Sequence, residues 1–197
     1  MVRIYKDGTV PTDNLFVKTP GALPEICSYG HRNLQGATLF PNGSLKTHED
    51  GPQGVDEINL TQAGVNHGWP VITYGENFGG GAIGEGITQK TGMAQPLYHW
   101  VPSIAPSGIP FATSERYRKA FQGNLLVGSL KFGYLNRIEL TQPFGEKAGK
   151  VARESRLLDK AGRVRAVRQG PDGLIYVLTE GASGKLIRLL PGGAAQR

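Results

Sequence analysis

The sequence predicts an all-β fold, a β-propeller whose ring is incomplete, because turn residues are frequent, apolar runs are short and a pattern repeats. The 197-residue chain has 29 glycines and 13 prolines, which favours many short elements over a few long helices. Residues 125–130 and 174–179 are apolar runs that follow Gly-containing turns, as strands do. Residues 114–121 offer a single helical turn, with Ser114 as the expected N-cap.

The repeat relates distant parts of the chain. Residues 41–51 parallel residues 171–181, since each reads as a turn, a strand and an acidic residue before glycine. A shorter unit recurs at residues 2–4, 136–138 and 187–189. Repeats of about 40–50 residues with several strands each are typical of propeller blades, although a β-sandwich also has short strands and frequent turns.

The length of the repeat limits the number of blades. At ~45 residues per blade, the chain holds about three to four blades. We therefore expect one partial propeller over residues 1–197, with a Gly-rich insertion or lid around residues 64–92. Such a propeller would form the C-terminal part of a longer protein, with open strand edges that favour self-association.

Composition excludes several classes of protein. The net charge is +6, but the basic residues are dispersed and are not interleaved with aromatic ones, so nucleic acid is not the expected partner. The single cysteine, Cys27, rules out an internal disulfide and a Cys-rich zinc site. No apolar stretch approaches the length of a membrane span, and the first residues do not resemble a signal peptide.

Several basic residues are candidates for binding an anion. Arg163 and Arg165 are two apart, so a strand would place both on one face, where guanidinium groups can clamp carboxylates. Arg168 would fall on the opposite face. A solvated strand edge is the alternative. Lys131 ends a strand, where lysine is usually only solvated.

A glycine-flanked loop is a second candidate. Arg32 and Asn33 lie between Gly30 and Gly36, and glycines allow the backbone to approach a ligand closely. An ordinary loop between two blades is equally compatible with this pattern.

A candidate metal site is built from backbone carbonyls. Gly51 and Pro52 follow two carboxylates and precede Asp56 and Glu57. Proline has no N–H, so this turn offers carbonyl oxygens without a competing donor, and carbonyls beside carboxylates suit Ca²⁺. A plain acidic turn is the alternative.

Other chemistry-bearing residues give weaker signals. Trp100 could form an aromatic wall over a flat ligand or belong to the core. The four histidines lack metal-site spacing, and no Ser–His–Asp arrangement is evident.

Taken together, these segments resemble the soluble pyrroloquinoline quinone (PQQ) dependent sugar dehydrogenases, the aldose sugar and glucose/sorbosone dehydrogenase family. The resemblance extends from about Lys6 to Pro191. It is carried by six segments in order: residues 30–36, 51–59, 66–70, 129–131, 163–165 and 170–173.

The resemblance implies a six-bladed propeller with PQQ, a flat tricarboxylate quinone, over its central opening. The residues implied to bind PQQ are Arg32, Asn33, Lys131, Arg163 and Arg165. Those implied for Ca²⁺ are the carbonyls of Gly51 and Pro52, with Asp56 in support and Glu57 at a second, structural Ca²⁺. Trp100 would line the sugar pocket.

The sequence departs from the family pattern in ways that bear on function. Asp50 stands where Gln or His is usual, and no histidine occupies the context of the catalytic base. We expect a periplasmic or secreted enzyme part that oxidises aldoses to lactones, passing hydride to PQQ and electrons to an external acceptor, and that is inactive alone. The alternative is a non-catalytic propeller module that binds carbohydrate or a protein partner.

Overall fold

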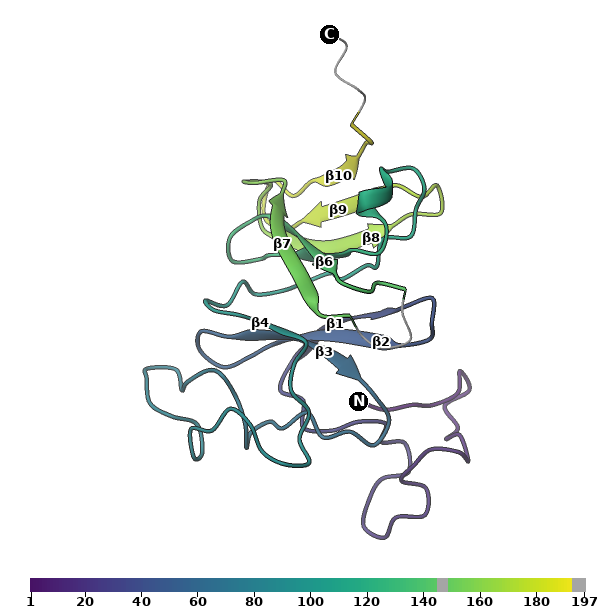
Figure 1. Cartoon of the computed structure of the whole chain (residues 1–197), viewed down its shortest axis with the longest axis vertical. Helices are drawn as coiled ribbons and strands as arrows, with labels where there is room; N and C mark the ends of the chain where they lie inside the picture. Colours follow the sequence, from purple (N-terminus) through teal and green to yellow (C-terminus); the bar gives the residue numbers. More distant parts are fainter. Residues whose placement is uncertain (145–148, 193–197) are drawn as a thin grey trace.

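Three antiparallel β-sheets lie one above another along the long axis of the protein (Figure 1). The computed structural model describes residues 1–144 and 149–192. The lower sheet has the order β1 (Leu34–Leu39), β2 (Leu45–Asp50), β3 (Asp56–Thr61) and β4 (Tyr98–Trp100). The middle sheet contains β5 (Leu125–Gly128), β6 (Leu135–Leu140) and β7 (Val151–Leu157). The upper sheet contains β8 (Val164–Gln169), β9 (Ile175–Thr179) and β10 (Leu186–Leu189).

The hairpins β1–β2 and β8–β9 are copies of one turn, as the sequence repeat predicted. Gly43 and Gly173 have φ of 81° and 78°, a left-handed conformation that favours glycine. The side chains of Asn42 and Asp172 each accept a hydrogen bond from the backbone N–H two residues later, at 3.0 and 3.1 Å. Such side-chain acceptors stabilise tight turns, so these turn residues set where the two strands of each hairpin begin.

The middle sheet gains an inner strand from residues 105–112, which pair irregularly with β5. Isolated bridges join Pro106 to Ser129 and Phe111 to Leu125. Ser107 Oγ donates to the Val164 carbonyl at 2.6 Å, which ties this segment to β8. Each sheet therefore has an inner strand beside the inner strand of the next sheet, as in propeller blades.

The three sheets share a backbone corner, defined here as the end of the second strand where it meets the residue before the inner strand. At each corner an N–H donates to a carbonyl, at 3.0, 3.0 and 2.9 Å. The donor and acceptor residues are Asp50 and Asn33, Leu130 and Ala105, and Glu180 and Arg163. Residues far apart in sequence thus occupy equivalent positions at one end of the sheets.

Two hydrophobic cores fill the spaces between the sheets. Leu125 and Val127 of β5 pack in the lower core with Phe40 and Ile58. Leu126, between them, packs in the upper core with the side chains of β8 and β9. Because both faces of β5 are buried, its sequence is a continuous apolar run instead of an alternating one.

Two details of the sequence prediction are wrong. The helical turn begins later than expected, as the 3₁₀ helix η1 (Lys119–Phe121), and Ser114 is not its N-cap. The Ser114 hydroxyl instead accepts the N–H of Arg116 at 3.1 Å within a turn. Residues 2–4 form only an isolated bridge from Val2 to Ile26, whereas the two later copies of this unit lie in β6 and β10.

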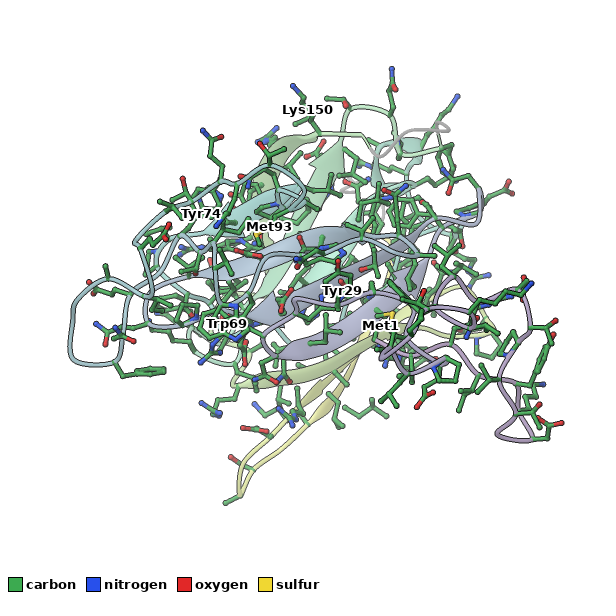
Figure 2. The ribbon with its side chains drawn as sticks, turned by 90° about the horizontal axis from the view of Figure 1, so that it is seen from below. Met1, Tyr29, Trp69, Tyr74, Met93 and Lys150 are labelled. Atoms are coloured by element: carbon green, nitrogen blue, oxygen red, sulfur yellow. The ribbon has the colours of Figure 1, made fainter. Side chains whose placement is uncertain are left out.

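Long loops cover the free face of the lower sheet. Residues 62–97, between β3 and β4, contain only isolated bridges and include the expected insertion. Figure 2 views this side, with Trp69, Tyr74 and Met93 of the long loop toward the left of the view and Met1 to their right. Within residues 1–144 and 149–192, no helix has the length and apolar character needed to cross a membrane.

Candidate cofactor site

A cavity of about 410 Å³ lies at the corners of the lower and middle sheets. It is lined by Arg32, Asn33, Asp50, Gly51, Pro52, Gln53, Gly54, Asp56, Phe78, Ser103, Ala105 and Lys131. The cavity brings together six residues that the sequence analysis proposed for PQQ or Ca²⁺. These six are Arg32, Asn33, Lys131, Gly51, Pro52 and Asp56.

The buried carboxylate of Glu49 holds the loop before β1. Its Oε2 accepts the backbone N–H groups of Arg32 at 2.6 Å and Asn33 at 3.3 Å. Its Oε1 accepts Asn59 Nδ2 at 2.9 Å. Burial opposes ionisation, but hydrogen bonds from His31 and these backbone groups outweigh it, so the pKa of Glu49 is lowered. Glu49 is therefore ionised, and its carboxylate positions the backbone of Arg32 and Asn33.

The Arg32 side chain is held by a hydrogen bond and by an aromatic contact. Nη1 donates to the Asp50 carbonyl at 2.8 Å. The guanidinium carbon lies 5.4 Å from the Trp69 ring centroid, within reach of a cation–π contact. Arg32 is thus oriented before any ligand arrives.

Asp50 is the most unusual group at the cavity. Its Oδ1 is buried and has no hydrogen-bond partner. Burial, followed by the nearby charge of Asp56, raises the pKa of Asp50 to about 6, although Arg32 and Arg165 act in the opposite direction. A buried carboxylate oxygen without a partner is costly, and a cation would satisfy it.

Gly51 and Pro52 directly follow Asp50 in the sequence and line the same cavity. A Cβ on Gly51 would lie 2.3 Å from the Val55 carbonyl oxygen, so the turn requires glycine. The Pro52 carbonyl accepts the Val55 N–H at 3.3 Å and keeps a second lone pair. Within residues 1–144 and 149–192, no three His, Cys, Asp or Glu side chains are grouped to hold a metal, so a cation here would depend on these carbonyls.

Asp56 connects the two corners. Its Oδ2 accepts the N–H groups of Ile104 at 2.6 Å and Ala105 at 3.0 Å, and its Oδ1 accepts Ser103 Oγ at 3.0 Å. Burial nevertheless raises the pKa of Asp56. With its oxygens used in this way, Asp56 supports the site from behind.

Glu57 faces a separate cavity of about 20 Å³, which Gly51, Pro52 and His67 also line. Burial and then the charge of Glu49 raise the pKa of Glu57 to about 7. Both ring nitrogens of His67 are buried without a partner. Glu57 is therefore close to the candidate metal carbonyls, on their far side.

Arg163 and Arg165 share one partner at the upper corner. Their Nε atoms lie 2.7 and 3.6 Å from the two carboxylate oxygens of Glu180, so both lie on one side of the sheet. Arg163 Nη1 also donates to the Leu130 carbonyl at 3.4 Å, next to Lys131. Neither arginine lines the 410 Å³ cavity.

Arg168 lies on the same side as Arg165, so the expectation from strict alternation is wrong. Both line a cavity of about 150 Å³ between the inner strands. The pairing of β8 with β9 slips between Val164 and Ala166, and a bulge of this kind changes which side chains share a face.

Trp100 does not line the candidate cofactor cavity. It is 4% exposed and belongs to the lower core, and its Nε1 donates to Glu154 Oε1 at 3.2 Å. Trp100 also lines a second cavity, of about 590 Å³, with Tyr98 and Phe132. Its assignment to the sugar pocket stays a prediction.

A Ser–His–Glu chain is present that the sequence analysis did not detect. Ser28 Oγ lies 2.8 Å from His31 Nε2, and His31 Nδ1 lies 3.4 Å from Glu49 Oε1. Ser28 is 1% exposed, so its hydroxyl cannot reach a substrate. The chain instead helps to fix Glu49, and with it the loop of Arg32.

Several site residues had only weak signals in the sequence. Glu49 and Asp50 read as an acidic turn, yet Glu49 is buried among polar strand residues. Trp69 and Gln53 lie in segments that carry the family resemblance but were given no role of their own, and Phe78 gave no signal, because loops bring these residues to the site.

The chain is similar to known proteins over nearly its whole length. The family model for glucose/sorbosone dehydrogenase matches residues 1–188. Aldose sugar dehydrogenase YliI of Escherichia coli (strain K12) is 40% identical over 194 residues, covering 97% of this chain and 50% of that protein. Quinoprotein glucose dehydrogenase B of Acinetobacter calcoaceticus is 28% identical over 233 residues, covering 92% and 48%.

The chain is also similar to solved structures of sugar dehydrogenases. A crystal structure of a glucose dehydrogenase is 41% identical with a TM-score of 0.87, covering 98% of this chain and 54% of that chain. The PQQ-bound form of aldose sugar dehydrogenase from Streptomyces coelicolor is 28% identical with a TM-score of 0.68, covering 95% and 50%. The chain spans about half the length of the curated relatives it matches.

Proposed function

The chain belongs to the glucose/sorbosone dehydrogenase family, as its motifs predicted, and from this premise we propose that it forms the PQQ-binding part of a sugar dehydrogenase that oxidises aldoses to lactones. One observation carries the proposal. A single cavity combines the basic residues Arg32 and Lys131 with the carbonyl turn of Gly51 and Pro52.

The chemistry of the cavity fits a flat tricarboxylate. Arg32 and Lys131 line it, and Arg163 reaches the carbonyl next to Lys131. Basic side chains form charge-assisted hydrogen bonds to carboxylates. The volume of about 410 Å³ lies in the usual range for small-molecule sites. Asn33 and Arg165 complete the proposed set around these three cations.

The same cavity fits Ca²⁺. The unpartnered Asp50 Oδ1 and the carbonyls of Gly51 and Pro52 are hard oxygen ligands, which Ca²⁺ prefers. Bound there, the ion would act as a Lewis acid on the quinone. Asp56 would hold the corner in place, and Glu57 would serve a second, structural ion.

Proton transfer from the sugar needs a general base, and we propose that this chain does not supply it alone. None of the four histidines is among the residues that line the cavity in the described ranges. Burial lowers the pKa of His48 and His67 to about 4. We therefore expect no dye-linked oxidation of aldoses by the isolated chain with PQQ and Ca²⁺, and glucose turnover would contradict this. In cells we place the enzyme in the periplasm or outside, with an external electron acceptor.

Calorimetry with PQQ tests the proposed site directly. Saturable binding should weaken when a chelator removes Ca²⁺. Lys131→Ala should weaken it about tenfold or more, because a hydrogen bond to a charged group contributes ~1.5–3 kcal/mol. Lys18→Ala, an exposed lysine on the N-terminal segment, is the matched control. Equal affinity of wild type and Lys131→Ala would refute the assignment.

A further inference from the structure

The loop of residues 76–82 carries an aromatic side chain to the rim of the same cavity. Phe78 lines the cavity and is 78% exposed. It is the one aromatic residue among the lining residues of the described ranges. We propose that Phe78 is a positioning residue that contacts the planar ring system of the bound ligand. This inference rests on the proposed function and adds an apolar contact to its charged ones.

The loop that carries Phe78 is tightly closed. Asn77 N donates to the Gly81 carbonyl and Asn77 Nδ2 to the Ala82 carbonyl, both at 2.9 Å. A bridge joins Glu76 to Ala82. The three residues after Phe78 are glycines with φ of 96°, 97° and 95°. Residues with a side chain rarely adopt this conformation, whereas glycine adopts it without strain. The sequence therefore specifies a narrow turn with one large side chain.

Gln53 anchors this turn to the cavity. Its Oε1 accepts the Gly79 N–H at 2.9 Å, and its Nε2 donates to Glu76 Oε1 at 3.1 Å. Its backbone carbonyl accepts the Glu76 N–H at 3.2 Å. Gln53 directly follows Pro52, so the backbone of the loop that carries Phe78 is tied to the turn of the candidate metal carbonyls.

The rest of the lining explains what an aromatic ring would add. Arg32, Lys131 and the carbonyl turn can hold the carboxylates and the ion, but they supply no aromatic partner for the flat face of a ring system. Aromatic pairs favour stacked or edge-to-face contact. A ring at the rim would therefore favour a planar polycarboxylate over a non-planar one of equal charge.

Calorimetry with two ligands separates this contact from charge. We expect Phe78→Ala to weaken PQQ binding about threefold to tenfold and to leave binding of citrate, a non-planar tricarboxylate, unchanged. Phe78→Tyr should retain PQQ affinity. Tyr5→Ala, which removes an exposed ring from the N-terminal segment, is the control. Lys131→Ala, in contrast, should weaken both ligands.

A double-mutant cycle with Gln53→Ala tests the anchor. Gln53→Ala should weaken PQQ binding in the wild type but change it little once Phe78 is Ala, because the two residues act as one unit. Additive effects would refute the anchoring role. Equal PQQ affinity of wild type and Phe78→Ala would overturn this inference alone, whereas a wild type that binds no PQQ would overturn the proposed function with it.

Discussion

Asp50 and Glu180 occupy the same position in the lower and upper sheets, but their carboxylates have opposite surroundings. Both backbone N–H groups close a corner, at 3.0 and 2.9 Å. Asp50 Oδ1 is buried without a partner, whereas Glu180 is paired with Arg163 and Arg165. One backbone frame thus offers an anion for a cation at one end and cations for an anion at the other.

The difference shows how a repeated fold can build an asymmetric site. Under the proposed function, the lower corner would bind Ca²⁺, the upper corner would bind carboxylates, and the middle corner would contribute Lys131. At the upper corner, Glu180 already pairs with Arg163 and Arg165. A ligand carboxylate would therefore compete with Glu180 for the two arginines.

The largest expected effect comes from removing the cations of the upper corner. Arg163→Ala with Arg165→Ala should weaken PQQ binding by about 100-fold or more, since each charge-assisted hydrogen bond contributes ~1.5–3 kcal/mol. Calorimetry in the presence of Ca²⁺ is the measurement. A double variant at Arg118 and Arg153, which are exposed and lie outside the three corners, is the control. Unchanged affinity would remove the upper corner from the site.

Removing the charge of the lower corner should act on the metal. Asp50→Asn should weaken Ca²⁺ binding on the order of tenfold, because an anionic ligand becomes neutral. Direct titration with Ca²⁺ measures this without PQQ. The exposed Asp159→Asn is the matched control. Tighter or equal Ca²⁺ binding in Asp50→Asn would show that Asp50 is not a ligand.

Releasing the arginines should have a smaller effect of opposite sign. Glu180→Gln removes their present partner, so PQQ should bind about threefold to tenfold more tightly. This range reflects an exposed ion pair, which contributes ~0.2–1 kcal/mol, and the loss of one negative charge near an anionic ligand. Weaker binding would mean that Glu180 is needed to orient the two arginines.

The lower corner also predicts a pH dependence. The pKa values of Asp50 and Glu57 are raised to about 6 and about 7, so the folded chain holds protons that the unfolded chain releases. Without Ca²⁺, these two carboxyl groups should therefore contribute a free energy of unfolding that falls as the pH rises from about 4 to about 8. The pKa values of His48 and His67, lowered to about 4, act in the opposite direction, so thermal melts of the wild type are compared with those of Asp50→Asn with Glu57→Gln. The midpoint of the wild type relative to that variant should fall at the higher pH, and Ca²⁺ should reduce the fall. A difference between the two midpoints that does not change with pH would contradict this account.

The smallest expected effect concerns association of the outer sheets. Leu178 and Leu186 of the upper sheet are 46% and 70% exposed, and apolar strand surfaces favour pairing with another chain. Light scattering at micromolar concentration should detect self-association, and Leu186→Lys should reduce it. A wild type that stays monomeric at this concentration would contradict the expected self-association.

The sequence was informative where chemistry depends on local patterns. The turns of Gly43 and Gly173 and the apolar run of β5 follow from residue type and spacing, so strands and repeat were predictable. The bulge at β8 was not, because a single extra residue in a ladder leaves no mark in composition, and it moved Arg168 to the other face. Trp100 could not be assigned from the sequence, since an aromatic residue near a strand end suits a core or a pocket equally. Phe78 lies in a loop that hydrogen bonds with Gln53, in the turn between β2 and β3, hold at the site, and such tertiary contacts leave no local pattern.

β5 belongs to both hydrophobic cores, with Leu126 on one side and Leu125 and Val127 on the other. The three sheets therefore resemble a short stack in which the middle layer packs against both of the others. If the upper layer separates while the lower core stays packed, one face of β5 remains buried. Both faces of β5 are exposed only when both cores open. Amide hydrogens of β5 should accordingly exchange last with solvent, and stability at the lower corner should outlast stability at the upper one.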